Sequence, residues 1–373
     1  MKRFAFDIDV VGACNLRCPS CPQGNSEGYR PPHGHMEPEL LADIIAKAKT
    51  ESLVTDISLF SWGEPLLHPR IHELVGCVRD AGIACHLSSN LNLMPDADAV
   101  MAANPASFKI SVSGFTQELY GYSHRGGNIE RVKKHMVELA EAKRRTNSRT
   151  RIFVNYHRYR HNLKEESLMR EFAAGLGFGF QPVWALMFPL EKILGMHTGS
   201  SKVSLTVEDQ ELIGRLVLPP RESLVVTQQY RTRPCALRDS QLSLNFQGQV
   251  QLCCGIFDSD KFSIGNYLDL PLVEIQRLRE THEMCGICQH HGAHVYLLQD
   301  IPELDELALT HIAPEDAKAL ELQREFAGKR LKRRLGELYQ KYFAGIITAE
   351  QVAAVEARFD RVLRLGSRTQ RPD

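Results

Sequence analysis

Residues 14–21 read Cys14-Asn-Leu-Arg-Cys18-Pro-Ser-Cys21, and they directly follow residues 4–11, whose alternating apolar side chains predict a β-strand. The spacing Cys-x3-Cys-x2-Cys puts three thiols on one loop, where they can hold one face of an iron–sulfur cubane but cannot complete its coordination. One iron would stay open, and an open metal position is what catalysis needs. Because loops after parallel strands form the active-site face of a β/α barrel, this loop predicts such a barrel with its reactive site at that face.

Two other kinds of site are compatible with three cysteines at this spacing. A fourth ligand, for example His33 or His35, would complete a structural zinc site. Two of the thiols would alternatively form a redox pair, with the third as a bystander.

The composition excludes several classes of protein. The 373-residue chain carries 45 basic and 45 acidic residues, and this balance argues against a general nucleic-acid binder. No apolar run is long enough to span a bilayer, and Asp7 and Asp9 interrupt the one N-terminal stretch that resembles an export signal. We therefore expect a cytoplasmic protein without membrane contact. Thiols stay reduced there, and eight of the ten cysteines fall in two groups, which favours metal binding over disulfides.

The first half of the chain alternates strand-like and helix-like segments, which implies a parallel sheet. Six β/α units fit within residues 1–200, fewer than the eight that close a full barrel. The sequence therefore predicts an α/β fold with a partial (β/α)6 TIM-like barrel. The expected strands are residues 4–11, 54–60, 83–88, 108–112, 151–156 and 178–185, and the expected helices are residues 37–51, 70–81, 95–103, 128–145 and 164–176.

After the barrel the alternation stops. Residues 201–230 are expected to be a connection, and residues 231–295 a small cysteine-rich domain with little helical period. In that domain residues 242–246 and 250–252 flank Gly248, a pattern that predicts a β-hairpin.

The last part of the chain, residues 296–373, is rich in Leu, Ala, Glu, Lys and Arg, and this composition predicts a C-terminal helical segment. Its basic run, residues 329–334, is expected to be a solvated helix face.

The cysteine loop and its place in the chain resemble the radical S-adenosylmethionine (SAM) superfamily. The signature of that family is a Cys-x3-Cys-x2-Cys loop after the first strand, matched here by Cys14, Cys18 and Cys21. Ser20 stands where many members carry an aromatic residue. The resemblance implies that the three cysteines hold a [4Fe–4S] cluster to which SAM binds.

After the second expected strand, Ser61-Trp62-Gly63-Glu64-Pro65 resembles the Gly-Gly-Glu-Pro turn of the family, with Trp62 in place of the first glycine. The resemblance implies that Gly63, Glu64 and Pro65 bind the amino group of SAM, since exposed carbonyls and a carboxylate are acceptors for an ammonium. Taken without its context, the segment would be a tight turn whose Glu64 caps the residues that follow.

Polar residues after the later strands are assigned to SAM by the same resemblance. They are Ser88, Asn90, Ser111, Arg125 and Asn155. An ordinary turn explains the segment around Ser88 equally well, and Arg125 could equally anchor the start of a helix. Trp184 could stack near adenine, but a buried core position is the safer expectation.

The second cysteine group is Cys235-x12-Gly248-x4-Cys253 followed, after a gap, by Cys285-x2-Cys288. It resembles the twitch domain, the shortened relative of the SPASM domain that follows some radical SAM barrels. The resemblance implies one auxiliary [4Fe–4S] cluster, and its full set of thiolate ligands suits it to electron transfer. Cys254 is a spare that could replace Cys253. Taken alone, the group fits a structural zinc site as well.

The resemblance implies a radical reaction. One electron from a flavodoxin- or ferredoxin-type donor cleaves SAM to a 5′-deoxyadenosyl radical, which abstracts hydrogen from the substrate. The auxiliary cluster then accepts an electron, so that the net reaction is an oxidation. A base would assist this step, and the polar candidates are His157, Arg158, His33 and His35.

Three hypotheses about the substrate are open. The first is a small polyhydroxy molecule (a sugar, aminocyclitol or nucleoside) that undergoes dehydrogenation, epimerisation or elimination. The second is a ribosomally made peptide, which we expect less because peptide-modifying relatives often carry an N-terminal recognition domain and the barrel here begins at residue 4. The third is a non-enzymatic zinc scaffold, which would leave the Trp-Gly-Glu-Pro turn unexplained.

Overall fold

The computed structural model describes residues 1–26, 29–200, 205–329 and 333. The chain divides into two compact units, Met1–Asp300 and Ile301–Asp373, and each is described by itself. The finer domain boundaries expected from the sequence stay predictions. Within the described residues no helix has the length and apolar character needed to cross a membrane.

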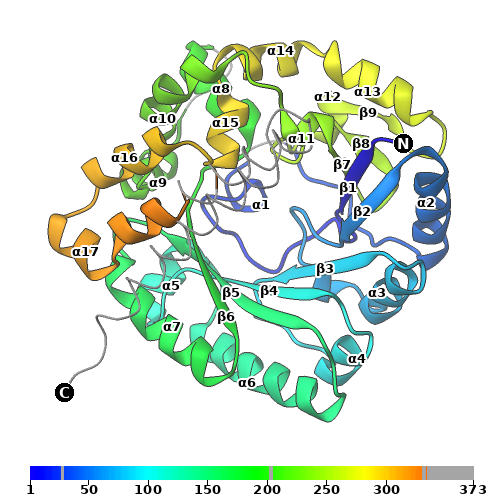
Figure 1. Ribbon diagram of the computed structural model, residues 1–373, viewed down its shortest axis with the longest axis horizontal. Helices are drawn as coiled ribbons and strands as arrows, with labels where there is room; N and C mark the ends of the chain where they lie inside the picture. Colours follow the sequence, from blue (N-terminus) through cyan, green and yellow to red (C-terminus); the bar gives the residue numbers. More distant parts are fainter. Residues whose placement is uncertain (27–28, 201–204, 330–332, 334–373) are drawn as a thin grey trace, which may run out of the picture. The chain divides into compact units, whose positions relative to one another are not determined.

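Six parallel strands form the larger part of the sheet in the first unit. Each strand pairs with the next one along the chain, and the spatial order is β6-β5-β4-β3-β2-β1. Figure 1 shows the strands as an arc with helices outside it. The predicted partial barrel is therefore confirmed. The strands are β1 (Arg3–Ile8), β2 (Leu53–Ser58), β3 (Ala84–Ser89), β4 (Ser107–Val112), β5 (Arg151–Arg158) and β6 (Gly179–Trp184).

The helices between these strands begin at recognisable signals. Pro38 is the first residue of α2, where its missing N–H costs no hydrogen bond. The side chain of Asn128 accepts a hydrogen bond from the N–H of Arg131 and so caps α6. The helices are α1 (Pro22–Asn25), α2 (Pro38–Glu51), α3 (Ile71–Asp80), α4 (Ala97–Ala102), α5 (Gln117–Ser123), α6 (Ile129–Arg145) and α7 (Glu166–Gly175), with short 3₁₀ turns at Pro65–Leu67 and Leu163–Glu165.

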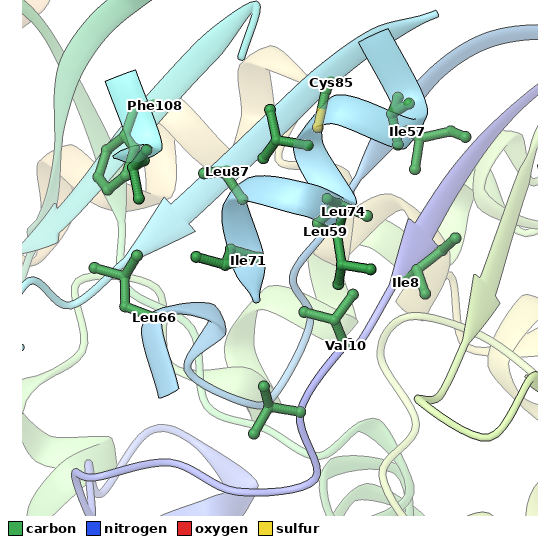
Figure 2. Close-up of a cluster of buried hydrophobic side chains, with 14 of the residues drawn as sticks. Ile8, Val10, Ile57, Leu59, Leu66, Ile71, Leu74, Cys85, Leu87 and Phe108 are labelled. Atoms are coloured by element: carbon green, nitrogen blue, oxygen red, sulfur yellow. The ribbon is translucent and has the colours of Figure 1, made fainter. Parts of the chain in front are cut away.

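The hydrophobic core of the barrel lies between the strands and these outer helices. Figure 2 shows Ile8, Ile57 and Leu87, each from a different strand, near Leu74 of α3. All four are almost fully buried. Because side chains alternate across a strand, the neighbours of these core residues point to the other face, into the barrel interior.

The cysteine-rich part of the chain continues the same sheet. β7 (Gln241–Leu244) pairs in parallel with β1, and β8 (Gln249–Gln251) and β9 (Ser263–Asn266) follow in antiparallel fashion. The expected hairpin is present, with Gly248 at a φ of +77° in its turn. A nine-stranded sheet therefore carries both cysteine groups.

The expectation of little helical period in this region was wrong. Five short helices, α11 to α15, begin within residues 231–295, and a helix of about two turns gives only a weak periodic signal in the sequence. In the described residues after β6, three more short helices, α8 to α10, precede them. These helices are α8 (Leu190–Thr198), α9 (Val207–Arg215), α10 (Pro220–Thr227), α11 (Ala236–Asp239), α12 (Ser259–Phe262), α13 (Leu272–Glu280), α14 (Glu283–His290) and α15 (Ala293–Leu298), with a 3₁₀ turn at Gln228–Tyr230.

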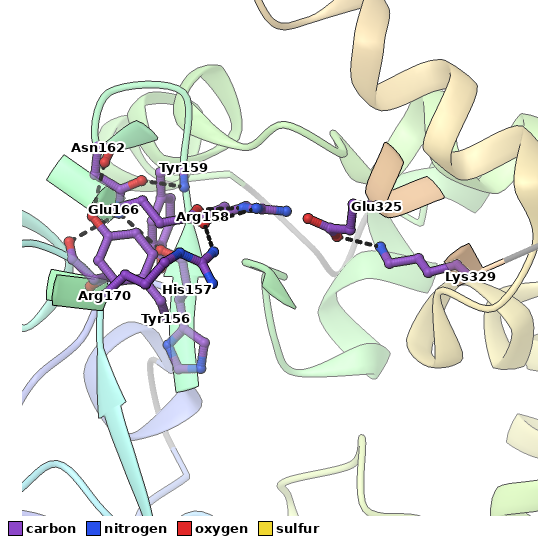
Figure 3. A network of polar contacts seen from close by, with 10 residues as sticks. Tyr156, His157, Arg158, Tyr159, Asn162, Glu166, Arg170, Glu325 and Lys329 are labelled. Atoms are coloured by element: carbon purple, nitrogen blue, oxygen red, sulfur yellow. Dashed lines mark hydrogen bonds and ion pairs between the residues drawn. The ribbon is translucent and has the colours of Figure 1, made fainter. Parts of the chain in front are cut away.

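The second unit contains α16 (Pro302–Thr310) and α17 (Pro314–Ala319). Within it the ammonium of Lys329 lies 3.1 Å from Glu325, a contact drawn in Figure 3, and 3.4 Å from Asp305. Most of the expected basic run beyond Lys329, and the rest of the predicted C-terminal helical segment, lie outside the described residues.

Candidate functional site

The cysteine loop follows β1 and leads into α1. Burial raises the pKa of Cys14 to about 11 and that of Cys18 to about 12, and it raises the pKa of Cys21 well above its ordinary value. After burial, the charges of Cys18 and Cys14 add to the rise in the pKa of Cys21. A positively charged metal centre would offset burial and repulsion together, so this set of thiols suits metal ligation.

Contacts with the far side of the barrel hold this loop. The hydroxyl of Tyr159 donates to the hydroxyl of Ser20 at 3.0 Å, and the N–H of Phe188 donates to the Ser20 carbonyl at 3.0 Å. The side-chain amide of Asn25 donates to the carbonyls of Pro19 and Phe188, each at 2.7 Å. The loop is therefore fixed to segments that follow β5 and β6.

The turn after β2 is held by a carboxylate that the sequence did not single out. Asp9, just beyond β1, accepts the backbone N–H of Gly63 at 3.0 Å and that of Trp62 at 3.2 Å. A Cβ at Gly63 would lie 1.9 Å from the carbonyl oxygen of Val11, so only glycine fits here. Burial raises the pKa of Asp9 to about 7, and the backbone donors oppose that rise.

Glu64 joins the turn after β2 to the segment after β3. Its carboxylate is 3% exposed and accepts the N–H of Leu66 at 3.1 Å and that of Asn90 at 2.9 Å. Its own N–H donates to the carbonyl of Ala13 beside the cysteine loop. Burial raises the pKa of Glu64 to about 7. Each carboxylate oxygen thus accepts one backbone N–H, and the expected role of Glu64 in binding SAM stays a prediction.

Several predicted SAM residues meet beside the cysteine loop. The side-chain amide of Asn90 donates to Asn15 at 2.9 Å and lies 3.8 Å from the sulfur of Cys14. The hydroxyls of Ser88 and Ser111 lie 3.4 Å apart. The predicted residues on β3 and β4 therefore form one polar surface, and Gly63 and the buried Pro65 belong to the adjoining turn.

On β5, Asn155 and His157 lie side by side, with 2.9 Å between Asn155 Nδ2 and His157 Nε2. Burial lowers the pKa of His157 to about 4 and that of His124 to about 3. The two imidazole rings lie parallel, with centroids 6.3 Å apart. At neutral pH both rings are therefore uncharged, and an uncharged ring can accept a proton.

Arg158, the other predicted catalytic candidate, points to the outer face of β5. Its guanidinium donates to Glu166 at 2.6 and 3.0 Å, and both side chains are 1% exposed (Figure 3). It also lies over the ring of Trp184 at 4.9 Å, so Trp184 belongs to the core on that side. Arg158 therefore pairs with Glu166 outside the barrel interior, and this geometry supports a structural role for it.

Three further candidates lie at the surface. The side chain of Arg125 is 46% exposed and pairs with Glu208 at 3.2 Å, while its backbone carbonyl accepts the N–H of Arg17 in the cysteine loop. His33 and His35 are exposed, and His35 lies 3.6 Å from Glu37. The structure does not bring these three side chains to the barrel interior.

The second cysteine group converges on one apolar cavity. Cys235, Cys253, Cys285 and Cys288 all line it, the last two from α14, together with Leu190, Leu237, Leu252, Ile256, Met284 and Leu297 among others. Cys254 is not among the lining residues, and its sulfur lies 4.0 Å from Gln241 Oε1. No group of three histidine, cysteine or acidic side chains in the described ranges is arranged to hold a metal ion as the side chains stand. The ligand roles of these cysteines stay predictions.

Arg279 is a second residue that sequence reasoning missed. It is 1% exposed, and its guanidinium donates to the carbonyls of Leu252, Leu237, Arg238 and Gln241 at 2.8 to 3.0 Å. The charges of the nearby cysteines oppose the lowering of its pKa by burial. An arginine inside a short helix carries no local sequence signal for such a role.

Comparison with known proteins finds a family match for residues 8–162 of the chain. Residues 8–162 match the model of the Radical SAM superfamily. The tungsten-containing aldehyde ferredoxin oxidoreductase cofactor-modifying protein of Pyrococcus furiosus is 26% identical over 133 residues, which are 34% of this chain and 36% of that protein. The match thus spans about a third of the length of that relative.

Two solved structures of Streptococcus suis SuiB share the fold. The one bound to S-adenosylmethionine has a TM-score of 0.51 at 14% identity and covers 77% of this chain and 68% of its own. The one bound to precursor peptide SuiA has a TM-score of 0.50 at 13% identity, with 76% and 66% covered. At these identities the likeness shows the fold alone. Residues 8–162 of the chain therefore match the radical SAM superfamily, and the fold shared with both SuiB structures agrees with that match.

Proposed function

We propose that this chain is a radical SAM oxidoreductase that takes hydrogen from a small polyhydroxy substrate of the sugar, aminocyclitol or nucleoside type. The bound [4Fe–4S] cluster and SAM supply a 5′-deoxyadenosyl radical after reduction by a flavodoxin- or ferredoxin-type donor. The observation that carries the proposal is the contact of Asn90, on the polar surface after β3, with both Asn15 and the sulfur of Cys14. The SAM side chains and the cluster loop are therefore one site.

The residues of the chain have separate tasks in this proposal. Cys14, Cys18 and Cys21 hold the cluster. Asp9 fixes the turn at Gly63, so that carbonyls of the turn are ready to accept the amino group of SAM. Such fixed acceptors need no rearrangement when the ligand binds, and this orders SAM for the reaction.

Proton transfer falls to His157 in this proposal. Its low pKa keeps the ring neutral at pH 7, and a substrate hydroxyl would replace the Asn155 amide at Nε2 to pass its proton to the ring. Because an amide N–H donates, the contact with Asn155 marks Nε2 as the unprotonated nitrogen. Asn155 is thereby the residue that sets the orientation of the ring.

The second cysteine group would hold the electron acceptor. Four cysteines around one apolar cavity support an auxiliary [4Fe–4S] cluster with Cys235, Cys253, Cys285 and Cys288 as ligands. A cluster with four thiolates has no open iron, so it accepts the electron of the substrate radical without binding the substrate. The overall reaction would then be a dehydrogenation.

A polar barrel interior supports a polyhydroxy substrate. His157, which the SAM assignment leaves unused, offers an imidazole there, and such a group matches the hydroxyls of a hydroxyl-rich ligand. A peptide substrate is the second candidate, but the likeness to SuiB concerns the fold and gives it no weight. If the protein is instead a non-enzymatic zinc scaffold, the purified chain should contain zinc in place of iron and should not cleave SAM.

The test is an anaerobic reconstitution of the purified full chain with iron and sulfide, followed by measurement of iron, sulfide and zinc. SAM and dithionite are then added, and 5′-deoxyadenosine is quantified. We expect about eight irons per chain, from two cubanes, and formation of 5′-deoxyadenosine. About four irons with 5′-deoxyadenosine would remove the auxiliary cluster from the proposal. Zinc without SAM cleavage would overturn it.

A further inference from the structure

The interior of the barrel carries charged groups that the SAM site does not use. Asp7 on β1 lies between Phe6 and Ile8, and Lys109 on β4 lies between Phe108 and Ile110. These four apolar neighbours belong to the outer core and are fully buried. Alternation along the strands therefore turns Asp7 and Lys109 into the barrel interior. An interior built only for stability would be filled with branched apolar side chains at these positions.

Asp7 is held in place by the neighbouring strands. Its carboxylate accepts a hydrogen bond from the side chain of Gln241 on β7. Burial raises its pKa to about 6, while Ser58, Lys109 and Gln241 oppose the rise. Gln241 thus holds the carboxylate of Asp7 in place, and this carboxylate remains a hydrogen-bond acceptor toward the barrel interior.

Unlike Lys47, Lys133 and Lys192, the half-buried Lys109 forms no ion pair among the described residues. Its ammonium lies 4.5 Å from the ring centroid of Phe60, and it feels the charge of Asp7 only at longer range. Within the described residues it has no hydrogen-bond acceptor and no carboxylate within 4 Å. By contrast, Lys192, whose side chain is 15% exposed, lies 2.7 Å from Asp209.

An ammonium carries three N–H donors, and burying them without acceptors costs free energy. A bound ligand that supplies an acceptor would remove that cost. Burial and, to a lesser degree, the charge of Lys109 lower the pKa of His157, which also faces the interior. His157 is therefore neutral at pH 7 and supplies no competing charge. Among the described residues, Asp7 on β1 and Lys109 on β4 give the interior a carboxylate and an ammonium that are not in contact, and the charge of Asp56 on β2 adds to the rise in the pKa of Asp7.

We propose that Lys109 and Asp7 form the substrate subsite of the barrel: Lys109 binds an anionic group, a carboxylate or a phosphate, and Asp7 accepts hydrogen bonds from hydroxyls of the same molecule. The substrate is then an acidic polyhydroxy molecule. This inference rests on the proposed function and narrows its substrate class. Phe60 holds the Lys109 ammonium in position through its ring face.

The test uses the reconstituted full chain with SAM and without reductant. D-glucose 6-phosphate, D-gluconate and D-glucose serve as probes, since they differ in the anionic group, and binding is measured by anaerobic calorimetry. We expect one or both anions to bind more tightly than glucose, and Lys109→Met to weaken that binding by about tenfold or more, as for a lost charged hydrogen bond. Comparison of the two anions tells a phosphate substrate from a carboxylate one.

Two variants control the experiment. Lys134→Met removes an ammonium from the surface of α6, where the side chain is 74% exposed, and should leave binding unchanged. Lys109→Arg keeps the charge and should retain part of the binding. Lys109→Met should still form 5′-deoxyadenosine with dithionite, so loss of binding there is distinct from failure of the SAM site. Equal binding of glucose, no binding of either anion, or full binding by Lys109→Met would overturn the inference.

Discussion

The indole Nε1 of Trp62 donates a hydrogen bond to the carbonyl of Ile256 at 3.1 Å. Trp62 belongs to the turn proposed to bind SAM, and Ile256 follows Cys253 and Cys254 of the second group. One side chain therefore joins the two predicted cluster sites. Its ring also packs edge-on against Phe188 at 5.2 Å and Phe257 at 6.1 Å. The residue that replaces a glycine of the family motif is therefore the structural link between the two halves of the site.

Trp62→Phe should destabilise this link and keep the aromatic packing. The carbonyl of the buried Ile256 would lose its donor, which costs about 1–3 kcal/mol. We expect the free energy of unfolding to fall by that amount and the KM for SAM to rise several-fold, measured by urea unfolding and by 5′-deoxyadenosine formation. Unchanged values of both would show that the hydrogen bond has no role in fixing the turn.

Cys18→Ala should remove SAM cleavage while the purified protein keeps the iron of the second site. The remaining two thiols cannot hold the first cluster, so iron should fall by about four per chain. Cys77→Ala, at a half-buried position of α3, is the matched control and should change neither quantity. Normal SAM cleavage by Cys18→Ala would contradict the assignment of the first site.

Cys253→Ser and Cys254→Ser should behave differently, although the residues are adjacent. Cys253 lines the cavity with the other three cysteines and Cys254 does not. We expect Cys253→Ser to lose the second cluster and to reduce product formation more than SAM cleavage. Cys254→Ser should retain its iron. Iron content and absorbance measure the outcome. If Cys254→Ser loses the second cluster and Cys253→Ser keeps it, Cys254 is the ligand and Cys253 is the spare.

Arg279→Met should damage the second cysteine site without touching a cysteine. Four carbonyls would lose their donor in a buried place, so we expect a loss of at least about 3 kcal/mol in the free energy of unfolding, together with poor retention of iron. Arg277→Met on the same helix is the control, since that side chain is 60% exposed and pairs only with Glu274. Equal stability of the two variants would deny Arg279 this role.

The contribution of His124 to the stability of the cluster-free protein should be lost in acid. Its pKa is about 3 in the folded chain and 6.5 when free, so between these values the unfolded chain binds a proton that the folded chain does not. This contribution is thus full above pH 6.5 and falls by at most about 1.4 kcal/mol per unit as the pH drops toward 3. The difference in stability between the native chain and His124→Gln, measured by urea unfolding at several pH values, should therefore change over this range. The same difference for His72→Gln, at an exposed position, should not change.

The barrel could be predicted from the sequence because its signals are local. Strands with alternating side chains and helices with proline or asparagine at their starts are visible within a few residues, as in α2 and α6. The helix that carries Cys285 and Cys288 was missed because eight residues, with Gly286 among them, give a poor periodic signal. The pairing of Ala5 with Gln241 was also missed, since no local pattern links such distant segments.

The site was predictable to the extent that motifs mark it. The cysteines, Gly63 and Asn90 follow from spacing and from the position after each strand. The support that Asp9 gives to the turn at Gly63 could not be predicted from the sequence. Alternation along the strand shows that Asp9 faces inward, but it does not show which backbone N–H the carboxylate accepts. Arg125 was singled out by the family resemblance and Arg158 as a polar residue after the fifth strand, and their partners Glu208 and Glu166 become visible only in three dimensions.

The parallel pairing of β7 with β1 has a consequence for how the protein is made. β1 is synthesised before both of its partners, and although β2 covers one edge early, the other edge stays open until the ribosome has produced Gln241–Leu244. An unpaired strand edge is a template for aggregation, so the nascent chain needs protection over that interval. Since β1 leads directly into the cysteine loop, we expect iron delivery to the first site to follow translation of the hairpin.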